Sequence, residues 1–182
     1  MAVAGRAFER MLRGGDRRSI GKSNQVVARV LRRPRSFGEL MSCLWSDDPV
    51  VRMRAADAAE KVSAQRPALL APFKGELLGL AEEATEAEVR WHLARMLPRL
   101  ALEGPERGRA TRRLRQYLND RSSIVKTMAI QGLCELAQGH SALEAEMAAL
   151  LEEFCRTGTP AMKARSRRLR REFSRRGVRA VR

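Results

Sequence analysis

Apolar residues recur at helical spacing along most of the chain, and four segments of it align with one another. The segments begin at Val51, Val89, Val125 and Met162, so that their starts lie 38, 36 and 37 residues apart. In the first three, the residues 0, 4, 8 and 11 places after the start are apolar and share one helical face. They are Val51, Ala55, Ala59, Val62, Val89, Leu93, Leu97, Leu100, Val125, Ala129, Leu133 and Leu136.

The fourth segment departs from this pattern. Met162 and Phe173 fit it, but Ser166 and Arg170 interrupt the apolar face. A terminal repeat has a neighbour on one side only, so we expect these two residues to form a polar outer surface.

A second set of helices alternates with the repeated ones. Spacings of three and four residues predict it over 36–45, 67–81, 106–118 and 141–155. The repeated helices begin near Pro49, Ala87, Ser123 and Pro160. No segment shows sustained strand alternation, so the sequence predicts an all-α protein.

Several helix starts carry capping signals. Asp47 or Asp48 is expected to cap the helix at Pro49. The capping box, in which two side chains satisfy the first backbone donors, matches Ser36 with Glu39. It also matches Ser141 with Glu144 and Thr85 with Glu88.

The start of the chain is polar and basic. Phe8, Met11 and Leu12 predict a short helix that Gly14 and Gly15 end, and Asn24 is expected to cap a further helix that stops at Pro34. The predicted division is a flexible basic lead-in over 1–22, a repeat domain over 23–176 and a basic tail over 177–182.

Helix pairs with a period of 36 to 38 residues, an Asp-Pro or Thr-Pro start and a following Val-Arg or Val-Lys resemble the HEAT-repeat, armadillo-like family. The resemblance covers about residues 36–173. It implies a right-handed α-solenoid of about four helix pairs, with the repeated helices on the concave side.

The net charge of +15 is concentrated at the two ends. Residues 1–35 hold ten Lys and Arg against Glu9 and Asp16, and residues 156–182 hold eleven against Glu172. Basic ends favour a polyanionic partner, through attraction to phosphate or carboxylate groups. Arginine and alanine richness is also what a GC-rich genome produces, and both interpretations stay open.

A basic residue follows the first apolar position in every copy, as Arg52, Arg90, Lys126 and Lys163. One interpretation is a basic stripe that contacts a ligand. The other is a ladder of ion pairs between repeats, formed with Asp48, Glu86 and Asp120. Lys163 has further basic neighbours and is the copy best placed to face a ligand.

Other positions of the repeated helices are candidates for a binding groove. Trp91 lies between cationic residues off the main apolar face, where it either stacks on a ligand or packs between repeats, whereas Trp45 is interpreted as a core edge. The groove-facing candidates are Met53, Arg54, Trp91, His92, Arg95, Arg99 and Arg167. The predicted partner-binding set is Arg54, Arg90, Trp91, His92, Arg95, Lys163, Arg167, Arg168 and Arg171.

The sequence contains no recognisable cofactor or metal site. Cys43, Cys134 and Cys155 are odd in number and widely spaced, which predicts core side chains and a reducing, cytoplasmic location. His92 and His140 are too isolated for a zinc site. Neither a secretory signal nor a membrane-spanning run is apparent.

One branch of HEAT-like proteins, which excises alkylated purines from DNA, resembles this chain in its helical repeats, basic surface and tryptophans. Its chemistry needs an aspartate in the groove near aromatic rings. Asp47 and Asp48 look like helix caps, and Trp91 has only Glu88 nearby, so no catalytic residue is carried over.

The sequence therefore predicts a monomeric, non-catalytic scaffold that binds an acidic protein or a nucleic acid and no small-molecule substrate. A dedicated DNA- or RNA-binding module is the first alternative, and an alkylpurine glycosylase is the second.

Overall fold

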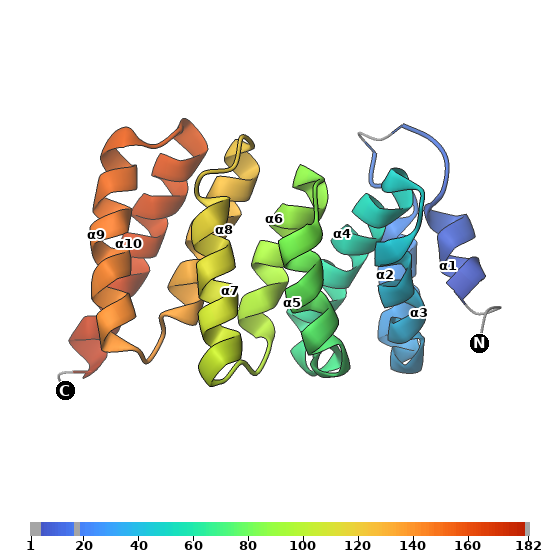
Figure 1. Ribbon diagram of the computed structural model, residues 1–182, viewed down its shortest axis with the longest axis horizontal. Coiled ribbons are helices and arrows are strands. Elements are labelled where there is room, and N and C mark those ends of the chain that lie inside the picture. Colours follow the sequence, from blue (N-terminus) through green and yellow to red (C-terminus); the bar gives the residue numbers. More distant parts are fainter. Residues whose placement is uncertain (1–4, 17–18, 181–182) are drawn as a thin grey trace. The chain divides into compact units, whose positions relative to one another are not determined.

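The computed structural model describes residues 5–16 and 19–180, and its regular structure is helical throughout (Figure 1). No β-strand occurs in these residues, so the predicted all-α class is confirmed. The chain divides into two compact units, residues 1–101 and 102–182. No helix in the described ranges is both long and apolar enough to cross a bilayer.

The first unit is built around α4. Its helices are α1 (Gly5–Leu12), α2 (Ser23–Arg32), α3 (Phe37–Ser42), α4 (Pro49–Gln65), α5 (Lys74–Glu83) and α6 (Ala87–Met96). Four short 3-10 helices join them: η1 (Pro34–Ser36), η2 (Cys43–Trp45), η3 (Pro67–Phe73) and η4 (Leu97–Arg99). α4 packs against α2, α6, α3 and α1. It is therefore surrounded by protein on several sides, which explains why ten of its residues are buried.

The second unit contains four longer helices. They are α7 (Gly104–Tyr117), α8 (Ser123–Leu136), α9 (Ser141–Thr157) and α10 (Pro160–Ala180). α7 packs on α8, α9 packs on α10, and α8 packs on α10. The two repeated helices of this unit, α8 and α10, are thus direct neighbours.

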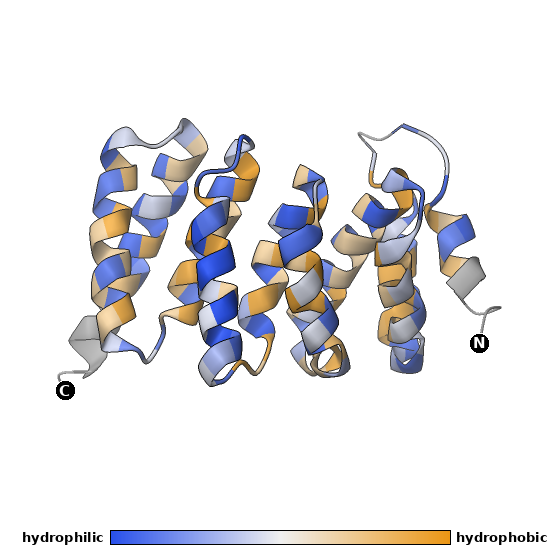
Figure 2. Ribbon diagram, viewed as in Figure 1, coloured by the Kyte–Doolittle hydropathy of each residue, from blue (hydrophilic) through white to orange (hydrophobic). Residues whose placement is uncertain are grey.

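The aligned apolar positions form the core. All twelve residues of the first three copies are buried, from Val51 at 0% exposure to Leu100 at 7%. Figure 2 shows hydrophobic and hydrophilic residues alternating along the helices, as amphipathic helices require. The predicted register is therefore confirmed for α4 and α8, and in the second copy Val89 and Leu93 lie on α6 whereas the buried Leu97 and Leu100 lie in and directly after η4.

The fourth copy differs from its prediction at one position. Arg170 is exposed as expected, but Ser166 is fully buried, so it is not part of a polar outer surface. Its hydroxyl oxygen has no hydrogen-bond partner among the described residues. α10 lies against both α8 and α9, which is why this face of the last repeat is covered.

Capping follows the prediction at α4 and at α10, where Thr159 Oγ1 accepts a hydrogen bond from the Met162 amide at 3.4 Å. Asp48 Oδ1 accepts a hydrogen bond from the Val50 amide at 2.8 Å, with Pro49 in the first turn. The capping box at Ser36 is wrong, because Ser36 ends η1 with a ψ of 0° and donates its hydroxyl to the Arg33 carbonyl. A cap residue needs extended backbone, which this 3-10 turn prevents.

The other predicted caps are also wrong. α2 begins at Ser23, α6 follows Glu86 and α9 follows His140, and none of them has a side-chain cap hydrogen bond at its N-cap residue. Glu144 instead accepts a hydrogen bond from the Gly139 amide at 3.0 Å.

The two ends of the chain are helical where they are described. The short helix predicted near Phe8 is α1, and Phe8 and Leu12 are buried. α10 continues to Ala180, past the point where the basic tail was expected to begin. Residues 1–4, 17–18 and 181–182, which belong to the predicted lead-in and tail, lie outside the described residues.

Candidate binding surface

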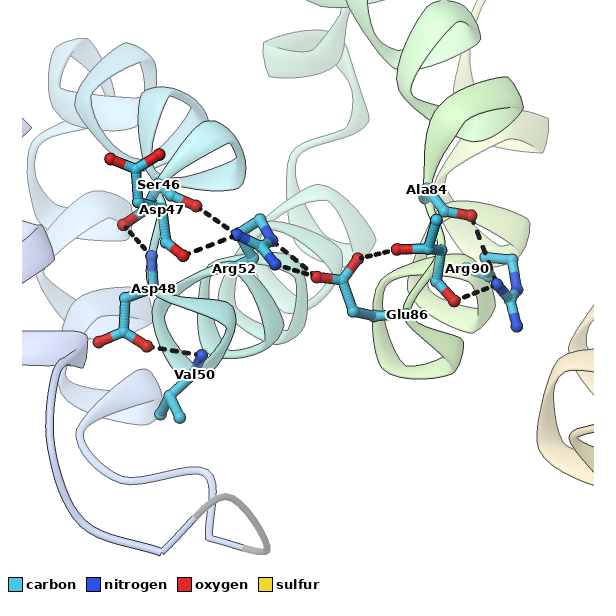
Figure 3. A network of polar contacts seen from close by, with 9 residues as sticks. Ser46, Asp47, Asp48, Val50, Arg52, Ala84, Glu86 and Arg90 are labelled. Carbon is cyan, nitrogen blue, oxygen red and sulfur yellow. Dashed lines mark hydrogen bonds and ion pairs between the residues drawn. The ribbon is translucent and has the colours of Figure 1, made fainter.

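The first recurring basic residue stabilises the start of α4 and its neighbour (Figure 3). Arg52 Nη1 donates to the carbonyl oxygens of Ser46 at 2.6 Å and Asp47 at 3.1 Å. Arg52 Nε donates to Glu86 Oε1 at 2.8 Å, and Nη2 forms an ion pair with the same oxygen. Arg52 is therefore a rung of the predicted ion-pair ladder, with Glu86 as its acid.

Arg90 makes a related arrangement at α6. Its Nη1 donates to the carbonyl oxygens of Ala84 at 3.4 Å and of Thr85, six and five residues before it (Figure 3). Arg52 holds carbonyls at the same two spacings. In the first unit, each recurring arginine thus donates hydrogen bonds to the turn before its own helix. These bonds limit Arg90 as a partner-binding residue.

The pKa of Glu86 reflects this arrangement. Partial burial acts to raise the pKa of its carboxyl group. Hydrogen bonds from Arg52, from the backbone and from Thr85, together with the charge of Arg52, outweigh this effect, and the pKa is lowered below its ordinary value. Glu86 is therefore ionised at neutral pH.

Lys126 and Lys163 occupy the same position in the second unit. Neither has an ion-pair partner among the described residues, and both side chains are half-buried. The ladder seen at Arg52 does not continue within this unit, so both ammonium groups keep the capacity to contact a ligand.

Arg54 does not face a partner, contrary to the prediction. Its side chain is only 2% exposed. The guanidinium donates to four backbone carbonyls of the segment before α2. They are Leu12 at 2.7 Å, Gly14 at 2.6 Å, Asp16 at 2.9 Å and Ser19 at 2.9 Å. Arg54 therefore anchors the part of the lead-in that surrounds it.

Gly21 shows how closely this segment approaches Arg54. Its φ is +51°, and a Cβ at this position would lie 2.7 Å from the guanidinium carbon of Arg54. Only glycine allows both the backbone conformation and the contact.

His92 is also buried, so its expected exposure is wrong. It is 2% exposed, and its Nδ1 has no hydrogen-bond partner among the described residues. Burial lowers the pKa of His92 to about 3, although the nearby Asp57 carboxylate acts to raise it. The imidazole is therefore neutral at physiological pH.

Trp91 is half-buried, and its ring centroid lies 3.3 Å from that of His92 at an interplanar angle of 32°. It is thus partly engaged by its own neighbour, while the exposed remainder is available for a contact. Whether it binds a partner stays a prediction.

Arg95 and Arg99 converge on one glutamate of α4. Arg99 Nη1 donates to the Glu60 carbonyl at 2.7 Å and to Ser63 Oγ at 2.8 Å, and Nη2 pairs with Glu60 Oε1. Arg95 Nε lies 3.9 Å from the same carboxylate oxygen. These groove candidates therefore link α6 and η4 to α4.

Asp57 is a polar core residue that the sequence analysis did not single out. It is 7% exposed and accepts hydrogen bonds from Ser23 Oγ and from Lys61 Nζ, the latter at 2.7 Å. Lys61 also donates to Asn24 Oδ1 at 2.9 Å, so the network joins α2 to α4. Its i, i+4 spacing to Lys61 was the available signal.

Exposed arginines gather on α10. Arg168 pairs with Glu172 at 2.9 Å and Arg170 with Glu152 at 3.0 Å. Arg167 and Arg171 are exposed. Among the side chains that the structure describes, neither has an ion-pair or hydrogen-bond partner. Among the predicted partner-binding residues, Arg167, Arg168 and Arg171 are the exposed ones, whereas the others are half-buried or buried.

An apolar groove lies between α8 and α10. It has a volume of about 360 Å³ and is lined by Ile124, Thr127, Met128, Ala161, Ala164, Arg165 and Arg168. Ile124 is 54% exposed, the largest fraction among the large apolar residues that the structure describes. The groove was not predicted from the sequence, although an isoleucine directly before the aligned Val125 was a visible signal.

Trp45 is exposed rather than a core edge. It ends η2 with 45% of its surface accessible, although the preceding Cys43 and Leu44 are buried. A 3-10 helix has three residues per turn instead of 3.6. Trp45 therefore points away from the buried face formed by Cys43 and Leu44.

The described residues contain no group of three or more His, Cys, Asp and Glu side chains that could hold a metal ion. Cys43, Cys134 and Cys155 form no disulfide bond with one another, and the first two are buried as expected. Burial raises the pKa of Cys43 to about 11, so its thiol is protonated and unreactive at neutral pH.

The chain matches no known protein-family model and no curated protein sequence.

Proposed function

We propose that this protein is a non-catalytic binding module for an acidic macromolecule, and that exposed arginines of α10 make the main contacts. The observation that carries the proposal is the exposure of Arg167 and Arg171 without a partner on the described surface of the second unit. They lie four residues apart, on one side of the helix. Carboxylate and phosphate groups are the ligands that guanidinium forks bind best.

The proposed architecture is a right-handed HEAT-like solenoid of about four helix pairs. The period of 36 to 38 residues and the burial of the aligned residues support it. In HEAT-like families the repeated helices lie on the concave side.

Retention of acidic macromolecules from native cell extract on the immobilised full chain tests the proposal. We expect the double variant Arg167→Glu with Arg171→Glu to retain at least about tenfold less than the unmodified chain, because like charges replace the contacts. The matched control, Arg66→Glu with Arg112→Glu, changes the net charge equally at two exposed arginines away from α10. Equal losses in both variants, or none in either, would contradict the proposal.

The same arginines could equally bind the phosphates of a nucleic acid as the acidic partner. Treating the extract with nuclease distinguishes a protein partner from a nucleic-acid partner. A protein partner is still retained after the treatment, whereas a nucleic-acid partner is lost. Direct phosphate binding should also weaken steeply as salt rises.

A glycosylase activity has less support. Asp57 acts electrostatically on His92, beside Trp91, but its carboxylate is engaged by Ser23 and Lys61. We therefore expect no release of bases from methylated DNA by the folded chain, and release would contradict the non-catalytic proposal.

A further inference from the structure

The α8/α10 groove is formed by two stripes of residues at helical spacing. Ile124, Thr127 and Met128 lie at i, i+3 and i+4 on α8. On α10, Ala161 and Ala164 form the low wall, and Arg165 and Arg168 follow one turn further on. The groove therefore runs along both helices, with an apolar end and a cationic end.

The apolar end is open to solvent. Ile124 is 54% exposed, and Ala161 and Ala164 are also exposed. Thr127 adds little polarity, because its hydroxyl already donates to the Ser123 carbonyl at 2.7 Å. Burying Ile124 and Met128 against another apolar surface would therefore be favourable.

The cationic end keeps donors for an incoming acid. Arg168 is 66% exposed along its side chain and uses Nε for Glu172. Arg165 donates from Nη1 to Gln131 Oε1 at 3.1 Å. A guanidinium has five N–H donors, so a single hydrogen bond leaves the Arg168 fork able to donate to a carboxylate.

In the first unit, the residue equivalent to Arg165 is covered by another segment of the chain. Arg54 stands three residues after Val51, as Arg165 stands three residues after Met162. Arg54 is enclosed by the segment that contributes the Leu12, Gly14, Asp16 and Ser19 carbonyls. The α10 counterpart lines an open groove instead.

We propose that the α8/α10 groove binds an acidic amphipathic helix of a partner protein, which rests on and deepens the proposed function. Apolar side chains of that helix at i, i+3 and i+4 cover Ile124 and Met128, and a carboxylate about one turn away reaches Arg168. A nucleic acid fits this groove less well, because its phosphates gain nothing from the apolar end.

Fluorescence anisotropy with the full chain tests this proposal. The probe is a labelled synthetic helix of about five turns, with leucine on one face and glutamate on its flanks. A second peptide has the same composition with the leucines spread around the helix. We expect the patterned peptide to bind at least about tenfold more tightly, because only it presents a continuous apolar face.

Two variants locate the site. Ile124→Asp and Arg168→Glu should each weaken binding of the patterned peptide about tenfold or more, as expected for central contacts. The matched controls are Ile20→Asp, at an isoleucine that is 42% exposed in the first unit, and Arg112→Glu on α7. Both should stay within about twofold, since neither residue lines the groove.

Equal affinity for the two peptides, or full binding by a folded Ile124→Asp variant, would overturn the proposal. If neither peptide binds, but substitution of Arg167 and Arg171 still reduces the retention of acidic macromolecules from extract, the groove assignment is wrong and the proposed function stands. If retention also fails, both are wrong. A duplex DNA probe that binds, and that Ile124→Asp leaves unchanged, would assign the acidic partner to the arginines alone.

Discussion

The Nε of Arg52 donates a hydrogen bond to Oε1 of Glu86 at 2.8 Å, and this bond joins α4 to the residue directly before α6. The same guanidinium holds the carbonyls of Ser46 and Asp47. One recurring arginine thus fixes both the turn before its own helix and the start of the next repeated helix.

A double-mutant cycle of Arg52→Ala and Glu86→Ala measures this relationship. The side chains are 25% and 16% exposed, so we expect a coupling free energy of about 1 kcal/mol in urea unfolding. Additive effects of the two substitutions would show that the pair contributes nothing.

The coupling should also depend on pH. Because the pKa of Glu86 is lowered in the folded state, its contribution is complete above the ordinary value of 4.5 and is lost as the pH falls through the folded pKa. Repeating the cycle at neutral and at acidic pH checks the sign, and a coupling that grows in acid would contradict it.

Arg54→Met should destabilise the protein strongly. The substitution leaves four backbone carbonyls without their donor, and we expect a loss of about 3 kcal/mol or more in urea unfolding. The segment before α2 should also become sensitive to a nonspecific protease. Arg66→Met, at an exposed arginine, is the control and should change stability by less than about 0.5 kcal/mol.

His92 makes stability depend on pH near neutrality. Its pKa is about 3 in the folded state against 6.5 ordinarily, so the unfolded chain binds a proton first as the pH falls. Below pH 6.5 the unmodified protein should lose about 1.4 kcal/mol per pH unit relative to His92→Gln. Parallel stability curves for the two proteins between pH 6 and 4 would contradict this.

Ser166→Ala should stabilise the second unit. The buried hydroxyl has no partner among the described residues, so its removal abolishes a desolvation cost of about 1 kcal/mol or more. Thermal unfolding measures the gain. Thr127→Val is the matched control, because Thr127 is buried with its hydroxyl bonded, and it should not stabilise.

Leu97→Ala tests the register of the repeat. Leu97 is 0% exposed, and its truncation should cost about 2–5 kcal/mol in chemical unfolding. Ile20→Ala, at a residue that is 42% exposed, should cost less than about 0.5 kcal/mol. A similarly small effect at Leu97 would contradict the alignment of the second copy.

The sequence by itself determined the helical class and the buried face of the repeated helices. Residues 0, 4, 8 and 11 places from Val51 share one face because helical geometry is local, and their apolar side chains favour the burial that the structure shows. The Asp48 cap was likewise readable, since it depends on residues within one turn.

Only the tertiary structure decided which of the remaining positions are buried and which are exposed. Arg54 is enclosed by carbonyls that lie 35 to 42 residues earlier in the chain, and Ser166 is covered by the packing of α10 on its neighbours. Periodicity cannot reveal such contacts, because a helix that packs on several sides, like α4, has no single buried face. The open groove beside Ile124 was hidden for the same reason: whether a position is covered depends on distant segments.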